Sequence, residues 1–162
     1  MIAATAGACY WGLEKTAGAE LGSKKKPLLV SVRSGAKFSM PGMMDTILNL
    51  GLNDEIAEGL AQKTGNPRFA YDSYRRFIQM FSNVVLDVDG HKFENVISRY
   101  KKTSGYTLDT EMTADDWKAV IVEFKTLSDF PEDPFQQLLL AVEAVFLSWY
   151  SPRAHVYREM NN

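Results

Sequence analysis

The sequence has few of the residues that build a metal centre or a disulfide scaffold. Its 162 residues include one Cys and two His. One Cys excludes an internal disulfide, and these residues together offer fewer nitrogen and sulfur ligands than a closed structural zinc site requires. We therefore expect Cys9 to be a small core residue, in a chain that works in a reducing, cytoplasm-like compartment.

An excess of charge of one sign and a long apolar run are absent too. Lys and Arg number 18 against 20 Asp and Glu, a net charge of −2, which argues against a broad basic surface for nucleic acid. No run approaches the ~18 apolar residues of a membrane-spanning helix. The chain also has no Gly-Lys-Ser/Thr phosphate loop and no Ser/His/Asp arrangement. Neither nucleic acid nor a membrane is expected as a partner, and His91 and His155 are not expected to be catalytic.

What the sequence does contain is helical periodicity. Residues 1–26 are predicted to form a helix to about Leu21 and a Lys-rich linker, residues 27–54 a strand and a loop, and residues 55–162 a series of helices. With about six helices and a short two-strand element, the expected fold class is α+β and mostly α. The most apolar helix, residues 135–150, is expected at the centre of the helical core.

Several helices carry start signals and one carries an apolar stripe. A second long helix is predicted to run from Pro67 to about Val88. The start signals are Asn53 or Asp54, Pro67, Thr113 followed by Asp116 in a capping-box pattern, and Ser151 before Pro152. The stripe consists of Phe69, Tyr74, Phe77, Ile78 and Phe81.

The strand segment is the least self-sufficient part of the chain. Residues 28–32 form a nearly continuous apolar run, which predicts a strand buried on both faces. Residues 47–52 fit either a second strand or one turn of helix. A single strand pair is too small to form a stable sheet by itself. We therefore expect the chain to be a piece of a larger domain.

The candidate binding residues lie between these two segments. Arg33 follows the strand, where its guanidinium suits a bidentate grip on phosphate or carboxylate; the alternative is an ion pair with a neighbouring Asp. In the loop that follows, Gly42 allows close approach of backbone N–H groups to an anion, and Ser39 and Thr46 can donate hydrogen bonds. Met44 can lie against a flat apolar ring such as a purine, or the methionines can fill a gap in the core.

A cluster of charges on one helix leaves two interpretations open. Arg68, Asp72, Arg75 and Arg76 lie within about two helical turns, at spacings that allow ion pairs along the helix. This pattern is typical of a solvated, charged helix face. The alternative is that one of the arginines helps to hold the phosphate loop or lines the binding cleft.

Four segments together resemble a known family. They are LLVSVRSGA at residues 28–36, SMPGMMDTILNLGLND at 39–54, FAYDSYRRFIQMF at 69–81 and SPRA at 151–154. These segments are similar to the N-terminal ATP-binding domain of the pyruvate, phosphate dikinases, and the second segment is the most specific. The resemblance covers nearly the whole chain after about residue 10.

The resemblance implies a helical subdomain of an ATP-grasp-like nucleotide-binding domain. Such an enzyme interconverts ATP, phosphate and pyruvate with AMP, pyrophosphate and phosphoenolpyruvate, uses Mg²⁺ and a phosphohistidine domain, and is typically a cytoplasmic homodimer, organellar in some eukaryotes. It implies that Arg33 contacts the nucleotide phosphates and that Gly42 and Met44 belong to the loop over the nucleotide.

The resemblance also sets expectations about what this chain lacks. The family's metal-binding carboxylates, phosphohistidine domain and pyruvate-binding domain have no counterpart in the sequence, so we expect no metal ligands here and no turnover by residues 1–162 alone. The alternative is a stand-alone helical interaction module that has lost the chemistry.

Overall fold

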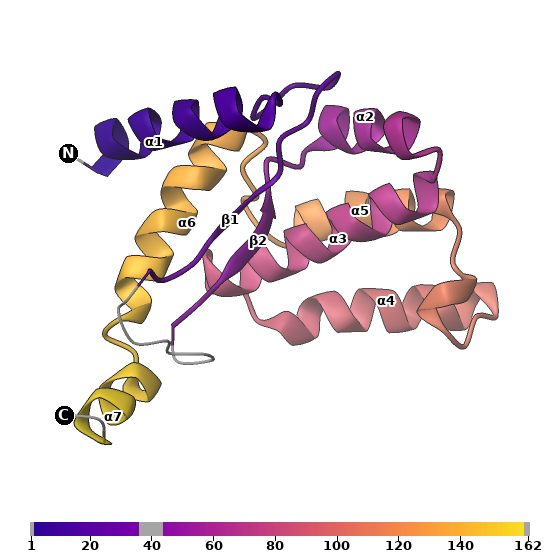
Figure 1. The fold of residues 1–162 in the computed structure, drawn as a ribbon. Coiled ribbons are helices and arrows are strands. Elements are labelled where there is room, and N and C mark those ends of the chain that lie inside the picture. Colours follow the sequence, from indigo (N-terminus) through magenta and orange to yellow (C-terminus); the bar gives the residue numbers. More distant parts are fainter. Residues whose placement is uncertain (1, 36–43, 161–162) are drawn as a thin grey trace.

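The structure is a computed structural model that describes residues 2–35 and 44–160, and this part is mostly helical, as predicted. Figure 1 shows two strands with α6 along one side and α3, α4 and α5 on the opposite side. The described elements are α1 (Ile2–Ala17), β1 (Val30–Val32), β2 (Ile47–Leu50), α2 (Asp54–Thr64), α3 (Pro67–Val84), α4 (Gly90–Ser104), a short 3₁₀ helix η1 (Asp109–Glu111), α5 (Ala114–Thr126), α6 (Pro134–Ser148) and α7 (Pro152–Met160).

The two strands form an antiparallel ribbon. Val30 pairs with Leu50 and Val32 with Ile47, which settles residues 47–50 as a strand rather than a helical turn. The prediction that the first strand is buried on both faces is wrong: Ser31 is exposed, and Val30 and Val32 are half-buried. The reason is that an apolar run without alternation does not reveal how many layers cover it, and here α6 packs beside β1.

Local signals placed most helix starts correctly, whereas α3 ends at Val84 rather than near Val88. The side chains of Asn53, Asn66 and Asp133 accept backbone N–H bonds at the starts of α2, α3 and α6, and Thr113 and Asp116 form the predicted capping box. α1 ends at Ala17 rather than near Leu21, because Gly18 takes the left-handed conformation (φ 62°) that stops a helix.

The centre of the core is α3, and the prediction that α6 occupies it is wrong. α3 packs against α2, α4, α5 and β2. The ring of Phe77 is fully buried and lies 5.6 Å from that of Phe81 and 5.4 Å from that of Phe130, between centroids. Phe69 is 51% exposed and lies off the predicted stripe. α6 packs on the strands by one side only and leaves Phe146 and Leu147 each 63% exposed.

The charged cluster on α3 is in part a buried network. The guanidinium of Arg75, a residue only 6% exposed, lies 4.4 Å from the centroid of the Trp117 ring and pairs with Asp72 (2.9 Å) and Asp109 (3.1 Å). Arg68 donates to the carbonyls of Asp109 and Met112. Both arginines therefore hold η1 and the segment after it on α3, which fits neither a solvated helix face nor a cleft lining.

Asp109 makes the stability of this network depend on pH. A hydrogen bond from Lys101 Nζ (2.7 Å), together with the charges of Lys101, Arg75 and Arg76, holds the pKa of the Asp109 carboxyl below its ordinary value. Such a carboxyl stabilises the folded chain above its ordinary pKa and ceases to do so as pH falls through the lowered pKa. We expect Asp109→Asn to be less stable near pH 7 and to lose less stability than the native chain between about pH 7 and about pH 3. Urea unfolding at both pH values measures this, and equal losses in the two proteins would contradict it.

One buried glutamine joins the two places where the chain enters and leaves helices α2–α5. Gln137, fully buried in the first turn of α6, donates from Nε2 to the carbonyls of Leu52 (2.9 Å) and Pro131 (2.8 Å). Its Oε1 accepts the N–H of Gly51 (3.0 Å). The segments around residues 52 and 131 are thus fixed side by side on α6.

Candidate functional site

Three of the predicted binding residues lie at one end of the strand ribbon. Arg33 directly follows β1, and Met44 and Thr46 come just before β2. Because Val32 pairs with Ile47, the antiparallel register brings Arg33 and Thr46 to the same end. Arg33 and Thr46 are exposed, whereas Met44 is half-buried against the core. Ser39 and Gly42 lie outside the described residues.

Arg33 is an exposed cation at the edge of a pocket. The ion pairs that arginines make within residues 2–35 and 44–160 use Arg75, Arg76, Arg99 and Arg153, so the alternative of an Arg33–Asp pair has no support there. Arg33 lies at a pocket of about 260 Å³. This pocket is otherwise mainly apolar, with Tyr10 and Leu13 from α1, Val30 and Val32 from β1, and Leu138 and Val142 from α6. An exposed cation beside an apolar hollow is a common arrangement in sites for small anionic ligands.

The residue between Met44 and Thr46 is held by the far end of α6. The backbone N–H of Asp45 donates to the buried hydroxyl of Ser148 (3.1 Å), and the Asp45 carboxylate lies 3.6 Å from Arg153 at the start of α7. Neither Ser148 nor Arg153 was predicted as a site residue. Arg153 lies in the SPRA segment of the family resemblance, whereas the contact of Ser148 with Asp45 spans 103 positions and has no local signature.

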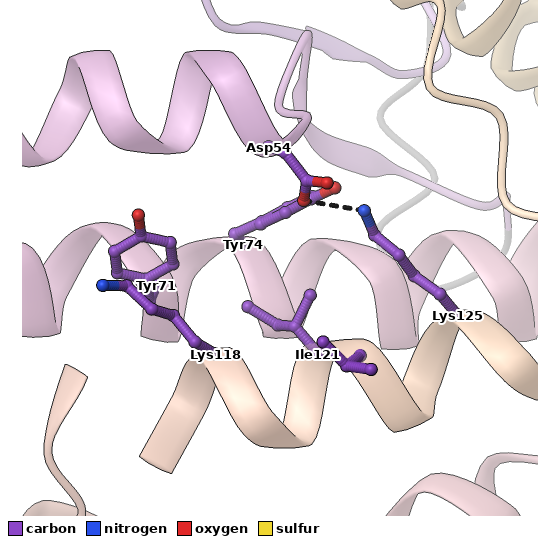
Figure 2. Close-up of a pocket in the computed structure, with 7 residues that line it drawn as sticks. Asp54, Tyr71, Tyr74, Lys118, Ile121 and Lys125 are labelled. Carbon is purple, nitrogen blue, oxygen red and sulfur yellow. Dashed lines mark hydrogen bonds and ion pairs between the residues drawn. The ribbon is translucent and has the colours of Figure 1, made fainter. Parts of the chain in front are cut away.

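A second pocket, of about 350 Å³, lies between α2, α3 and α5 (Figure 2). Lys125 reaches across it and pairs with Asp54 (2.7 Å) and with Glu132. Burial alone would lower the pKa of the Lys125 amine, but the hydrogen bonds to these two carboxylates raise it overall. Lys125 is therefore a fixed, charged side chain that joins α5 to the start of α2.

The tyrosines of this second pocket are unsuited to proton transfer near neutral pH. Burial, and then the nearby carboxylates, raise the pKa of the Tyr71 and Tyr74 hydroxyls well above the ordinary value. Tyr71 donates its hydroxyl to Glu58 (2.6 Å), and Lys118 lies over its ring. Lys125, Asp54 and Tyr71 are engaged in ion pairs and hydrogen bonds, whereas the buried Tyr74 hydroxyl has no hydrogen-bond partner among the described residues. We do not take this pocket as the reaction site.

The described residues also bear on two other classes of site. Within residues 2–35 and 44–160, no group of three or more His, Cys, Asp or Glu side chains is placed to hold a metal ion. The residues present therefore do not fit Mg²⁺ by themselves. Over the same residues, no helix combines the length and the apolar character needed to cross a membrane.

Comparison with known proteins settles the family. The profile of the family described as "Pyruvate phosphate dikinase, AMP/ATP-binding domain" matches residues 9–162. The chain belongs to this family. It is 57% identical over 157 residues to the pyruvate, phosphate dikinase of Clostridium symbiosum, with 93% of this chain and 18% of that protein covered. It is 54% identical over 155 residues to the chloroplastic enzyme of Mesembryanthemum crystallinum and 53% to the enzyme of Giardia intestinalis, with 92% of this chain covered in both cases.

The matched relatives are much longer than this chain. It spans 18%, 16% and 18% of the three dikinases named above. The resemblance seen in the sequence is thus confirmed at the level of the family, and the helix-rich fold agrees with it.

Proposed function

We propose that this chain forms part of the ATP-binding domain of a pyruvate, phosphate dikinase. The complete enzyme would interconvert ATP, phosphate and pyruvate with AMP, pyrophosphate and phosphoenolpyruvate, with further domains carrying the phosphohistidine and the pyruvate site. The observation that carries the proposal is the placement of Arg33, exposed and outside the ion pairs of the described residues, at the same end of the ribbon as Thr46.

The proposed work of this site is electrostatic. Arg33 would bind phosphate oxygens of the nucleotide with two parallel N–H bonds and offset the charge that builds on the transferred phosphoryl group. Thr46 and Ser39 would donate hydroxyl hydrogen bonds, and Gly42 would let backbone N–H groups approach the phosphates. Met44 would pack beside the nucleotide. Since the described residues do not fit Mg²⁺, we assign no metal ligand to this chain and expect those carboxylates elsewhere in the enzyme.

Two further parts of the proposal concern assembly and compartment. We propose a homodimeric complete enzyme in a cytoplasm-like compartment. Some relatives carry "chloroplastic" in their names, which leaves an organellar setting as the alternative in eukaryotes. Size-exclusion chromatography with light scattering on the complete gene product tests the dimer.

Phosphoryl transfer and nucleotide binding test the main proposal together. The complete gene product that contains this chain is expected to form phosphoenolpyruvate from ATP, phosphate and pyruvate in a coupled assay, whereas the 162-residue chain alone is expected to show no turnover. ATP or AMP is expected to raise the melting temperature of the complete gene product. Absence of both activities there would contradict the proposal and favour an interaction module, for which the exposed Phe146, Leu147 and Tyr150 would offer a contact surface. Clear phosphoenolpyruvate formation by the isolated chain would show that the site is complete here.

A further inference from the structure

α6 is attached to the region of β2 at both ends. Near its N-terminus, Gln137 bonds Gly51 and Leu52, which follow β2; at its C-terminus, Ser148 bonds Asp45, which precedes β2. α6 therefore lies antiparallel to β2. From Gln137 to Ser148 a helix rises about 16 Å, and from Asp45 to Gly51 a fully extended chain would span about 20 Å. The segment is shorter than this limit where Asn49 (φ 60°) departs from the extended conformation.

The hydrogen bonds of Ser148 fix the orientation of its hydroxyl group. The hydroxyl hydrogen is donated to the carbonyl of Val145 (2.7 Å) in the preceding turn. This directs the oxygen lone pairs to the N–H of Asp45, because a hydroxyl has one hydrogen to donate and two lone pairs to accept with. Ser148 is only 6% exposed, so water cannot readily replace it as the acceptor for that N–H.

We infer that Ser148 is a positioning residue for the nucleotide phosphates. It fixes the backbone of Asp45, whose direct neighbours are Met44 and Thr46. Because Val32 pairs with Ile47, fixing this end of β2 also restrains Arg33, which directly follows Val32. Ser148 itself lies in α6, and among residues 2–35 and 44–160 its hydrogen bond to the site is made to the backbone of Asp45. The inference rests on the proposed function, because it assigns Ser148 an effect on the phosphate contacts of that site.

The test compares loss of this hydroxyl with loss of another buried hydroxyl. Ser148→Ala in the complete gene product is expected to raise the KM for ATP about three- to tenfold, as expected for one lost hydrogen bond, with kcat changed less than about twofold. Ser148→Thr, which keeps the hydroxyl, is expected to restore most of the affinity. The control is Ser82→Ala in α3, where the fully buried Ser82 hydroxyl bonds Ser128 (2.7 Å), and the KM is expected to stay at the native value.

A second readout follows the hydrogen bond without nucleotide. Amide hydrogen exchange at Asp45 is expected to be at least about tenfold faster in Ser148→Ala than in the native protein and unchanged in Ser82→Ala.

Arg153→Ala repeats the KM test at an exposed position that does not endanger folding, since the Arg153 side chain is 66% exposed. It is expected to raise the KM about twofold, in keeping with a weak surface pair.

The outcomes separate this inference from the proposed function. If the native protein uses ATP and neither Ser148→Ala nor Arg153→Ala changes the KM, the inference is overturned and the proposed function stands. A KM that rises equally in Ser148→Ala and Ser82→Ala also overturns it, because the effect is then a general loss of stability. If the native protein shows no ATP-dependent reaction or binding, the proposed function fails and the inference fails with it.

Discussion

Arg33→Ala is expected to lower the rate of ATP-dependent phosphorylation by about 100- to 1,000-fold while leaving the fold intact. The rate effect follows from removing a preorganised cation from the place where charge develops on the phosphoryl group. The fold is expected to survive because Arg33 is exposed and makes no ion pair among the described residues, so the free energy of unfolding should change by less than about 0.5 kcal/mol. Rapid-quench phosphorylation of the complete gene product and urea unfolding measure the two quantities.

Arg99→Ala is the matched control for Arg33→Ala. Arg99 is an exposed arginine on α4 that pairs with Glu123, far along the chain from the strand ribbon. Its removal takes away the same charge from the surface and is expected to leave the phosphorylation rate within about twofold. Equal rates in Arg33→Ala and the native protein would remove Arg33 from the site. A loss of the same size in Arg99→Ala would show that net charge alone is responsible.

Phe77→Ala is expected to destabilise the chain by about 3–5 kcal/mol. Phe77 is 1% exposed, and its ring meets those of Phe81 and Phe130 edge to face, so the substitution removes both buried area and aromatic contacts at the centre of the core. A loss of this size is a large share of the ~5–15 kcal/mol by which folded domains are usually stable. Equilibrium unfolding in urea gives the difference.

The control for this substitution lies on the same helix. Phe69→Ala makes the same chemical change on α3 at a side chain that is 51% exposed, and it is expected to cost less than about 1 kcal/mol. Similar losses at the two positions would mean that burial of Phe77 is not the cause of its effect. A loss below about 1 kcal/mol at Phe77 would mean that its surroundings collapse to fill the cavity.

Helix positions were predictable because the signals that set them are local. Thr113 and Asp116 bond each other's backbone within one turn, and Gly65 ends α2 through its own left-handed conformation. The sequence was less informative about which helix lies at the centre of the core and which covers the strand ribbon from outside. The apolar character of α6 suggested a central helix, but a helix that covers a two-strand ribbon on one side keeps apolar side chains on its other side, such as Phe146. Apolar content alone does not distinguish these two placements.

The charged and polar residues of the interior were harder to predict from the sequence. Arg75 lies in a helical pattern of charges typical of a solvated face, yet it is buried because Trp117 and Asp109, both more than 30 positions away, provide a stacking partner and a counter-charge. Ser148 and Gln137 are alike in this respect, since their partners lie far along the chain. For the site, the sequence predicted Arg33, Met44 and Thr46, which the ribbon brings to one end; that they contact a nucleotide stays a prediction.

The closeness of residues 52 and 131 on Gln137 has a consequence for how this chain can be divided. Since residues 53–130 leave and rejoin the rest of the chain at one point, they have the geometry of an inserted module whose two ends meet. The ribbon still depends on this helical part, because α3 packs on β2 and the buried Ile47 and Leu50 belong to the same core as Phe77. The strands that carry Arg33 are therefore supported by α6 on one side and by residues 53–130 on the other.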